Sequence, residues 1–254
     1  MKKAHSPKSN TEISKSKVLL VEGQDEENLF SELLVDLNLA NDIQIISVGG
    51  KEKFPIRLKG LKVRSGYELI TSIGIVRDAD ENPTGAFQSV CSALKNVGLP
   101  KPIAPSQPTI DNPKVTVMII PDAETKGMIE NVCLESVKDD PAIACVDQYF
   151  QCLQRQLKKL PKNPAKARVH AFLASRDWLE IAHFEYLQRC LEDYELVVPT
   201  SSAVATAKVH VFLASRYTPN LRLGEAAKKQ KDSDRYWQFN HPAFDKIKQF
   251  LRIL

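Results

Sequence analysis

Three features common in proteins are missing from this chain of 254 residues. No apolar run approaches the roughly 20 residues that cross a bilayer, and the N-terminus lacks the hydrophobic segment of a signal peptide. The five cysteines are odd in number and include no CxxC pair, so neither a disulfide framework nor a zinc knuckle is indicated. We therefore expect a cytoplasmic protein without membrane contact, whose cysteines are buried and reduced.

Charge is also unevenly placed along the chain. Residues 1–17 hold five lysines against Glu12 alone, which accounts for the whole formal net charge of +4. Residues 1–16 are expected to form a disordered basic tail. A nucleic-acid surface would have to come from local clusters, and two stretches qualify: 158–176, with six cations and no acid, and 208–231, with six cations and Glu225. Candidate binding residues within them are Lys166, Arg168 and Lys208.

Four short, continuous apolar runs have the character of buried parallel strands. Helical patterns separate them, and Thr84 is a candidate cap for a helix that extends to about Val97. Five prolines between residues 100 and 113 predict an extended connection before the last strand. This order predicts an α/β fold, a parallel sheet flanked by helices. The expected strands are 17–22, 43–48, a run that ends at Arg77 or Asp78, and 114–120.

The second half of the chain has mainly helical patterns. Residues 168–176 are nearly repeated at 208–216, which indicates duplication of one helix. Trp178 and Trp237 are expected to serve in packing. The helical segments are expected near 128–138, 141–159, 165–175, 177–192 and 204–216, with a last helix from Pro242.

Acidic residues follow three of the predicted strands. Glu22 and Glu26 are four residues apart where the first strand turns into its helix, and a helical turn brings both to one side. Asp78 and Asp80 end the third strand, where extended geometry also directs both to one side. Glu130 follows the fourth strand. Since the carboxyl ends of parallel strands form the ligand crevice, these carboxylates are predicted to bind a divalent cation, Mg²⁺ or Mn²⁺.

Each acidic cluster has an ordinary explanation when taken alone. Acidic residues favour helix N-termini, so Asp25, Glu26 and Glu27 could simply stabilise the first helix. Asp-x-Asp is common in loops, and Glu130 could be a solvated helix residue. The order and placement of the three clusters together favour a site.

The Val-Glu-Gly sequence at residues 21–23, followed by Asp-x-Asp at residues 78–80, resembles the Toprim domain of topoisomerases, bacterial primases and nucleases of the OLD (overcoming-lysogenization-defect) family. The resemblance is closest to stand-alone Toprim-like proteins of uncharacterised function. It implies a Toprim-like, Rossmannoid domain over residues 17–254, with a core at about 17–135 and a helical C-terminal extension at about 136–254.

The resemblance also implies roles for single residues. Glu22 would be a metal ligand or general acid/base, and Asp78 and Asp80 would be metal ligands; all three would be catalytic. Glu26 and Glu130 match further acids of OLD-type sites. Lys166 or Lys208 could be the basic residue near the scissile phosphate. Unlike its larger relatives, the chain has no ATPase domain before the Toprim-like region, no primase zinc ribbon and no topoisomerase tyrosine domain.

These inferences lead to a divalent-metal-dependent nuclease that hydrolyses phosphodiester bonds, with DNA favoured over RNA as its partner. Two metal ions about 3.5–4 Å apart could activate water and stabilise the leaving oxygen. The alternative is a non-catalytic Toprim-like module that binds nucleic acid or regulates a separate ATPase or effector protein. Nucleotidyl transfer is a third possibility. Strand preference and oligomeric state stay open.

Overall fold

The computed structural model describes residues 12–157, 163–174, 223–224, 226–228 and 236–254. The chain forms two compact units, Met1–Val132 with Phe239–Leu254, and Cys133–Gln238. Among the described helices, none is both long and apolar enough to span a membrane.

The first unit is built on a four-stranded parallel sheet in the order β2-β1-β3-β4. The central strands are almost wholly apolar because both faces are covered, which is typical of parallel sheets. The sheet confirms the predicted α/β class. Its strands are β1 (Lys17–Val21), β2 (Ile43–Ser47), β3 (Ser72–Asp78) and β4 (Lys114–Ile120).

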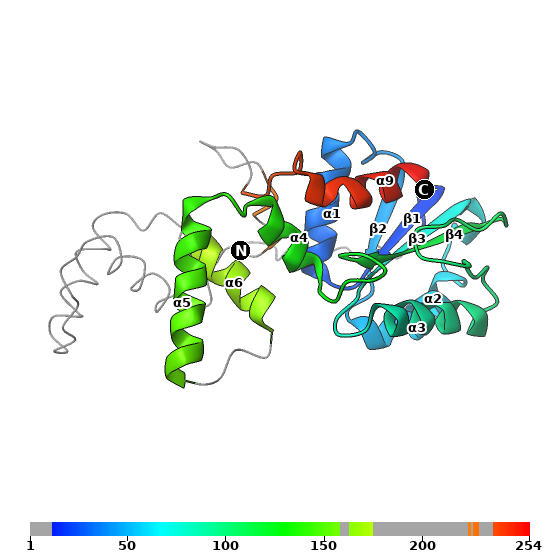
Figure 1. Ribbon diagram of the computed structural model, residues 1–254. Helices are drawn as coiled ribbons and strands as arrows, with labels where there is room; N and C mark the ends of the chain where they lie inside the picture. The colour runs from blue at the N-terminus through cyan, green and yellow to red at the C-terminus, as the bar shows by residue number, and fades with distance from the viewer. Residues whose placement is uncertain (1–11, 158–162, 175–222, 225, 229–235) are drawn as a thin grey trace, which may run out of the picture. The chain divides into compact units, whose positions relative to one another are not determined.

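Helices cover the two faces of this sheet in pairs (Figure 1). On one face, α2 (Phe54–Leu61) and α3 (Pro83–Asn96) enclose the main apolar core, to which β3 contributes Ile73 and Ile75. On the other face lie α1 (Gln24–Asp36) and α9 (Asp245–Ile253). Short 3₁₀ turns flank α2, namely η1 (Lys51–Lys53) and η2 (Tyr67–Leu69).

The last helix returns to the sheet rather than ending the helical extension. Its 3₁₀ start, η3 (Pro242–Phe244), is where the sequence predicts it, and Leu254 is buried against β3. A Cβ atom on Gly74 would lie 2.7 Å from both Leu254 methyl groups, so this glycine allows the close approach. Lys114 Nζ also donates to the carbonyl of Ile253 at 2.6 Å. The expected extension of 136–254 is therefore interrupted, because Phe239–Leu254 belongs with the sheet.

Two local predictions in the first unit need correction. Residues 12–16, assigned to the disordered tail, are anchored: Ile13 is 1% exposed and Ser14 N donates to Gln44 Oε1 at 2.8 Å. The basic charge of this segment predicted disorder, but the apolar Ile13 within it packs in the core. Helix α3 is capped by Asn82, whose side chain accepts from Gly85 N at 2.9 Å, rather than by Thr84, because Pro83 already fits the first helical position.

The second unit contains α5 (Pro141–Leu157) and α6 (Pro164–Ala174), which pack against each other, while α4 (Ile129–Ser136) begins in the first unit. Trp237 is fully buried, stacks on Phe172 and donates from Nε1 to Leu223 O at 2.9 Å, which confirms its packing role. The helices expected at 177–192 and 204–216, Trp178 and the second repeat copy lie outside the described residues.

The prediction of buried cysteines is only half right. Cys91 and Cys133 are buried, whereas Cys145 and Cys152 are exposed. The two exposed cysteines are seven residues apart on α5, so they share the solvent side of that helix. Cys190 lies outside the described residues.

Candidate active site

The acidic residues lie where the carboxyl ends of β1 and β3 meet the loops that follow them. The carbonyl of Glu22 accepts hydrogen bonds from Gly49 N at 2.9 Å and Gly50 N at 2.8 Å, which ties the loop after β1 to the loop after β2. Both glycines have positive φ, 84° and 120°, so the turn uses backbone conformations that other residues rarely adopt. The rim of the site is therefore shaped by backbone contacts.

Asp78, the last residue of β3, is surrounded by other acids. Burial is the main reason that its pKa is raised well above its ordinary value, and the charges of Glu26, Glu130 and Glu22 raise the pKa further. One hydrogen bond opposes this, from Ile129 N at the start of α4 to Asp78 Oδ1 at 3.1 Å. The fold therefore brings three of the other predicted metal ligands close enough to Asp78 to raise its pKa.

The fifth predicted ligand, Asp80, raises the pKa of Glu22 but is not among the charges that raise the pKa of Asp78. Its φ is +49°, and its backbone exchanges two hydrogen bonds with Gly127, N to O at 2.8 Å and O to N at 2.9 Å. The extended geometry that would direct Asp78 and Asp80 to one side therefore ends with β3. This part of the sequence prediction was wrong, because a bridge to a residue 47 positions away sets the backbone of Asp80.

Arg77 pairs with Glu22 of the Val-Glu-Gly sequence and with Asp80 of the Asp-x-Asp sequence. Its Nη1 donates to Glu22 Oε2 at 2.8 Å and its Nη2 donates to Asp80 Oδ2 at 3.2 Å, with only 9% of the Arg77 side chain exposed. Lys51 Nζ adds a third contact, to Asp80 Oδ2 at 2.9 Å. Burial raises the pKa of Asp80, but the hydrogen bonds from Lys51 and Arg77 outweigh it, so the pKa is lowered overall.

Glu22 stands between the two groups of charges. Burial is the largest influence and raises its pKa, Arg77 lowers it, and the charges of Glu26 and Asp80 raise it, with a net upward shift. The Glu26 carboxylate lies close to the neighbouring Gly23, since a Cβ atom there would be 2.8 Å from Glu26 Oε2. Glu22 and Glu26 thus share one side of the site, as their spacing predicted.

Sequence reasoning missed Arg77 and Lys51. Arg77 interrupts an otherwise apolar strand, and a cation inside a buried strand needs a partner, so the signal was available. Lys51 follows the Gly49-Gly50 turn, and its partner is decided only by how the β2 and β3 loops meet. Both cations lie among the acids without being part of the predicted ligand set.

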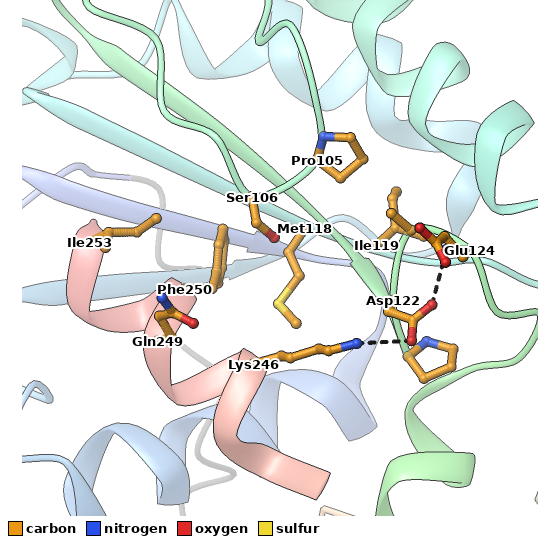
Figure 2. A pocket seen from close by; sticks show the side chains of 12 residues that line it. Pro105, Ser106, Met118, Ile119, Asp122, Glu124, Lys246, Gln249, Phe250 and Ile253 are labelled. Carbon is orange, nitrogen blue, oxygen red and sulfur yellow. Dashed lines mark hydrogen bonds and ion pairs between the residues drawn. The ribbon is translucent and has the colours of Figure 1, made fainter. Parts of the chain in front are cut away.

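Another carboxylate at the same edge of the sheet, Asp122, is already satisfied (Figure 2). Its Oδ1 accepts from Glu124 N at 3.0 Å and Thr125 N at 2.7 Å, and Lys246 Nζ of α9 donates to its Oδ2 at 3.0 Å. Burial raises the pKa of Asp122, but these hydrogen bonds lower it far more. A hollow of about 360 Å³ with Met118 and Phe250 in its lining opens beside this pair. Asp122 secures α9 rather than joining the acidic site.

The donor set of the acidic site fits a hard divalent cation in its chemistry, because it consists of carboxylate oxygens around a buried Asp78 that has one hydrogen-bond donor. Its present arrangement is less favourable. Within the residues that the structure describes, no three His, Cys, Asp or Glu side chains are grouped so that they could hold a metal ion. Side-chain rotation at Glu22, Glu26 or Glu130 would be needed to complete a coordination shell.

The predicted nucleic-acid residues belong to the second unit. Lys166 is exposed on α6, whereas Arg168 Nη2 is paired with Asp147 Oδ1 on α5. The stretch 158–176 contains no acidic residue, but the fold supplies one to it from α5. Lys208 lies outside the described residues.

The family described as "Protein of unknown function (DUF3226)" matches residues 16–189. Among solved structures, the C-terminal region of the Xanthomonas campestris pv. campestris OLD protein is 16% identical, with 94% of this chain and 95% of that chain covered and a TM-score of 0.37. A hypothetical protein from Pyrococcus horikoshii OT3 is also 16% identical, with 81% and 91% covered and a TM-score of 0.41. No curated protein matches the chain in sequence.

Proposed function

The chain belongs to the DUF3226 family of proteins of unknown function, and we propose that its acidic site is that of a Mg²⁺- or Mn²⁺-dependent hydrolase of nucleic-acid phosphodiester bonds. One observation carries the proposal. Asp78 is buried among Glu22, Glu26 and Glu130; burial is the main cause of its raised pKa, and the negative charges of the three glutamates raise that pKa further. A divalent cation relieves this excess of negative charge and reverses the local charge, which a polyanionic substrate requires.

The residues divide the work according to their surroundings. Asp78, Glu22, Glu26 and Glu130 would hold the cation, since they share the Asp78 side of the site. When bound, the cation lowers the pKa of a water ligand and stabilises charge on the phosphate oxygens. Glu22 also has a raised pKa, which brings it closer to the range where a carboxylate accepts and returns protons at neutral pH.

Arg77 and Lys51 would bind the phosphate groups of the substrate on the Asp80 side of the site. A guanidinium that already holds two carboxylates in fixed positions can hold a phosphate oxygen in the same way. Asp80 keeps both cations at the edge of the site, so it acts in orienting them. DNA is the preferred substrate in this proposal, with RNA as the comparison.

The test is a cleavage assay on plasmid, single-stranded DNA and RNA, in EDTA, Mg²⁺ or Mn²⁺. Cleavage should require the metal, and Asp78→Asn should reduce it by at least 100-fold with the fold intact. The matched control is Glu81→Gln, which removes one negative charge a single residue beyond Asp80, from a side chain that is 89% exposed and paired with Lys126. Absence of cleavage with either metal, or equal losses in both variants, would reject the hydrolase.

A non-catalytic module is the second candidate, and Arg77 favours it. Because its guanidinium is paired with Glu22 and Asp80, and Lys51 is also paired with Asp80, part of the acidic site is balanced without a metal. Such a module would bind nucleic acid or a separate ATPase or effector protein without turnover. In that case Asp78→Asn and Asp80→Asn would bind nucleic acid as the wild type does, and neither they nor the wild type would cleave it.

A further inference from the structure

A basic surface lies next to the acidic site, on η1 and α2. Residues 51–64 contain six lysines and arginines against one acid, Glu52, in a chain whose charge beyond residue 17 sums to zero. Five of the six cations are exposed. The cations are Lys51, Lys53, Arg57, Lys59, Lys62 and Arg64.

Helix α2 presents two kinds of side chain to solvent. Its buried face consists of Phe54, Leu58 and Leu61, which pack into the core below the sheet. At 100° per residue, Ile56 and Lys59 fall on the opposite side, and Val63 lies in the turn just after the helix. Ile56 is 73% exposed and Val63 is 83% exposed, so two apolar side chains flank a lysine on the outer face.

The cations lead from this helix to the acidic site. Lys53 Nζ lies 3.6 Å, and Arg57 Nη2 4.0 Å, from the position of a Cβ atom on Gly49, so both charges gather at the turn that contacts Glu22. Lys51 continues the row as far as Asp80. The crowding of like charges also appears at Arg64, where burial first and Arg57 second lower the pKa.

Three cations of this surface are not paired with carboxylates of the described residues. In the part of the chain that the structure describes, Lys53, Arg57 and Lys59 form no ion pair, and Arg57 Nε instead donates to Val48 O at 3.0 Å. Lys126, Lys138 and Lys246, by contrast, are each paired with a carboxylate. Cations that have no carboxylate partner in the protein are available to phosphate groups.

We propose that the basic surface of η1 and α2 binds single-stranded nucleic acid and directs it towards the acidic site. Lys53, Arg57 and Lys59 contact phosphates, while Ile56 and Val63 contact bases. A duplex hides the apolar faces of its bases, whereas a single strand exposes them, so exposed apolar side chains among cations fit a single strand. The inference rests on the proposed function for its substrate class, although binding itself needs no catalysis.

The test is fluorescence anisotropy in EDTA, so that no cleavage occurs, with a fluorescein-labelled 20-nucleotide oligothymidine and with a 20-base-pair duplex. The triple variant Lys53→Gln/Arg57→Gln/Lys59→Gln should bind oligothymidine at least tenfold more weakly. Its plot of log affinity against log salt should flatten by about 2, from three lost contacts at about 0.7 each. The control, Lys126→Gln/Lys138→Gln/Lys246→Gln, loses the same charge from paired lysines and should bind within about twofold of wild type.

The variant Ile56→Gln distinguishes binding that includes contacts with the bases of a single strand from binding through phosphates alone. It should weaken oligothymidine binding about threefold and leave duplex binding unchanged. Equal binding by the two triple variants, no binding by the wild type, or no effect of Ile56→Gln would overturn the proposal. If the wild type cleaves nothing but the triple variant of residues 53, 57 and 59 binds more weakly than it, only the hydrolase is refuted. If the wild type is an active enzyme and this variant binds as well as it does, only the binding surface is refuted. Circular dichroism checks that all variants are folded.

Discussion

Asp78 and Asp80 are two residues apart, yet their carboxyl groups lie in opposite electrostatic surroundings. Asp78 is buried beside Glu22, Glu26 and Glu130, and its pKa is raised. Asp80 contacts Arg77 and Lys51, and its pKa is lowered. One side of the site therefore has an unbalanced negative charge, while the other has its cations built into the protein.

The difference teaches that one motif can supply two functions. A carboxylate that lacks cations is suited to a metal, and a carboxylate that already holds two cations is suited to positioning them. The change occurs at Ala79, where the extended strand ends and Asp80 enters the left-handed region. Variants on the two sides should therefore respond differently, and five predictions can break or sharpen the comparison.

The largest effect is expected from Arg77→Met. Removing this buried cation leaves Glu22 without its ion pair and Asp80 with Lys51 alone, and we expect the free energy of unfolding to fall by about 3 kcal/mol. Urea denaturation at pH 7 measures it. Lys51→Gln, which removes a half-exposed cation from the same Asp80 oxygen, should cost less than about 1 kcal/mol. Similar losses in both variants would show that Arg77 does not organise the site.

Divalent metal should act mainly on the Asp78 side. A hundredfold excess of Mn²⁺ over its dissociation constant should stabilise the wild type by about 2.7 kcal/mol, seen as a raised melting temperature. Asp78→Asn should abolish this gain, whereas Glu81→Gln should retain it. An unchanged melting temperature of the wild type in millimolar Mn²⁺ would remove the main support for the metal site.

Asn substitutions at the two aspartates should shift stability in opposite directions at pH 7. Asp78→Asn removes a buried charge among like charges, so the free energy of unfolding should rise by about 1 kcal/mol. Asp80→Asn removes the partner of two cations and should lower it by less than about 1 kcal/mol, because these groups are partly exposed. Shifts of the same sign would contradict the comparison.

The pH dependence of these variants follows from the two pKa shifts. Protonated Asp78 contributes its full stability below the ordinary pKa of 3.8, and this contribution is lost as the pH rises through the raised pKa of Asp78 in the folded protein. The gain in stability of Asp78→Asn should therefore appear only at higher pH. Stability from ionised Asp80 is present above 3.8 and is lost as pH falls through the lowered folded value. Urea unfolding from pH 3 to 8 tests both trends.

The smallest effect is expected at Asp122, a carboxylate that is balanced mainly by backbone. Lys246→Met should lower the free energy of unfolding by less than about 1 kcal/mol, because Lys246 is two-thirds exposed and Asp122 retains two backbone hydrogen bonds. Metal stabilisation should be unaffected. A loss of Mn²⁺ binding in Lys246→Met would place Asp122 within the metal site.

Much of the sheet could be predicted because its signals are local. The run Lys114–Ile120 was predicted with the bounds that β4 has, and the strand before the acidic motif does end at Asp78. Continuous apolar residues between polar turns suffice for such assignments, since a strand buried on both faces has little choice of composition. The grouping of Glu22 and Glu26 followed in the same way from helical spacing.

The sequence by itself thus determined the α/β class, the strands and the edge of the sheet where the acids gather. Only the tertiary structure decided how those acids are divided. The backbone of Asp80 is set by its bridge to Gly127, and Arg77 is held by carboxylates that follow two different strands. Leu254, just after α9, packs closely against Gly74. These contacts join residues far apart in the chain, so no local spacing encodes them, and the charge balance of each carboxyl group exists only once the strands are side by side.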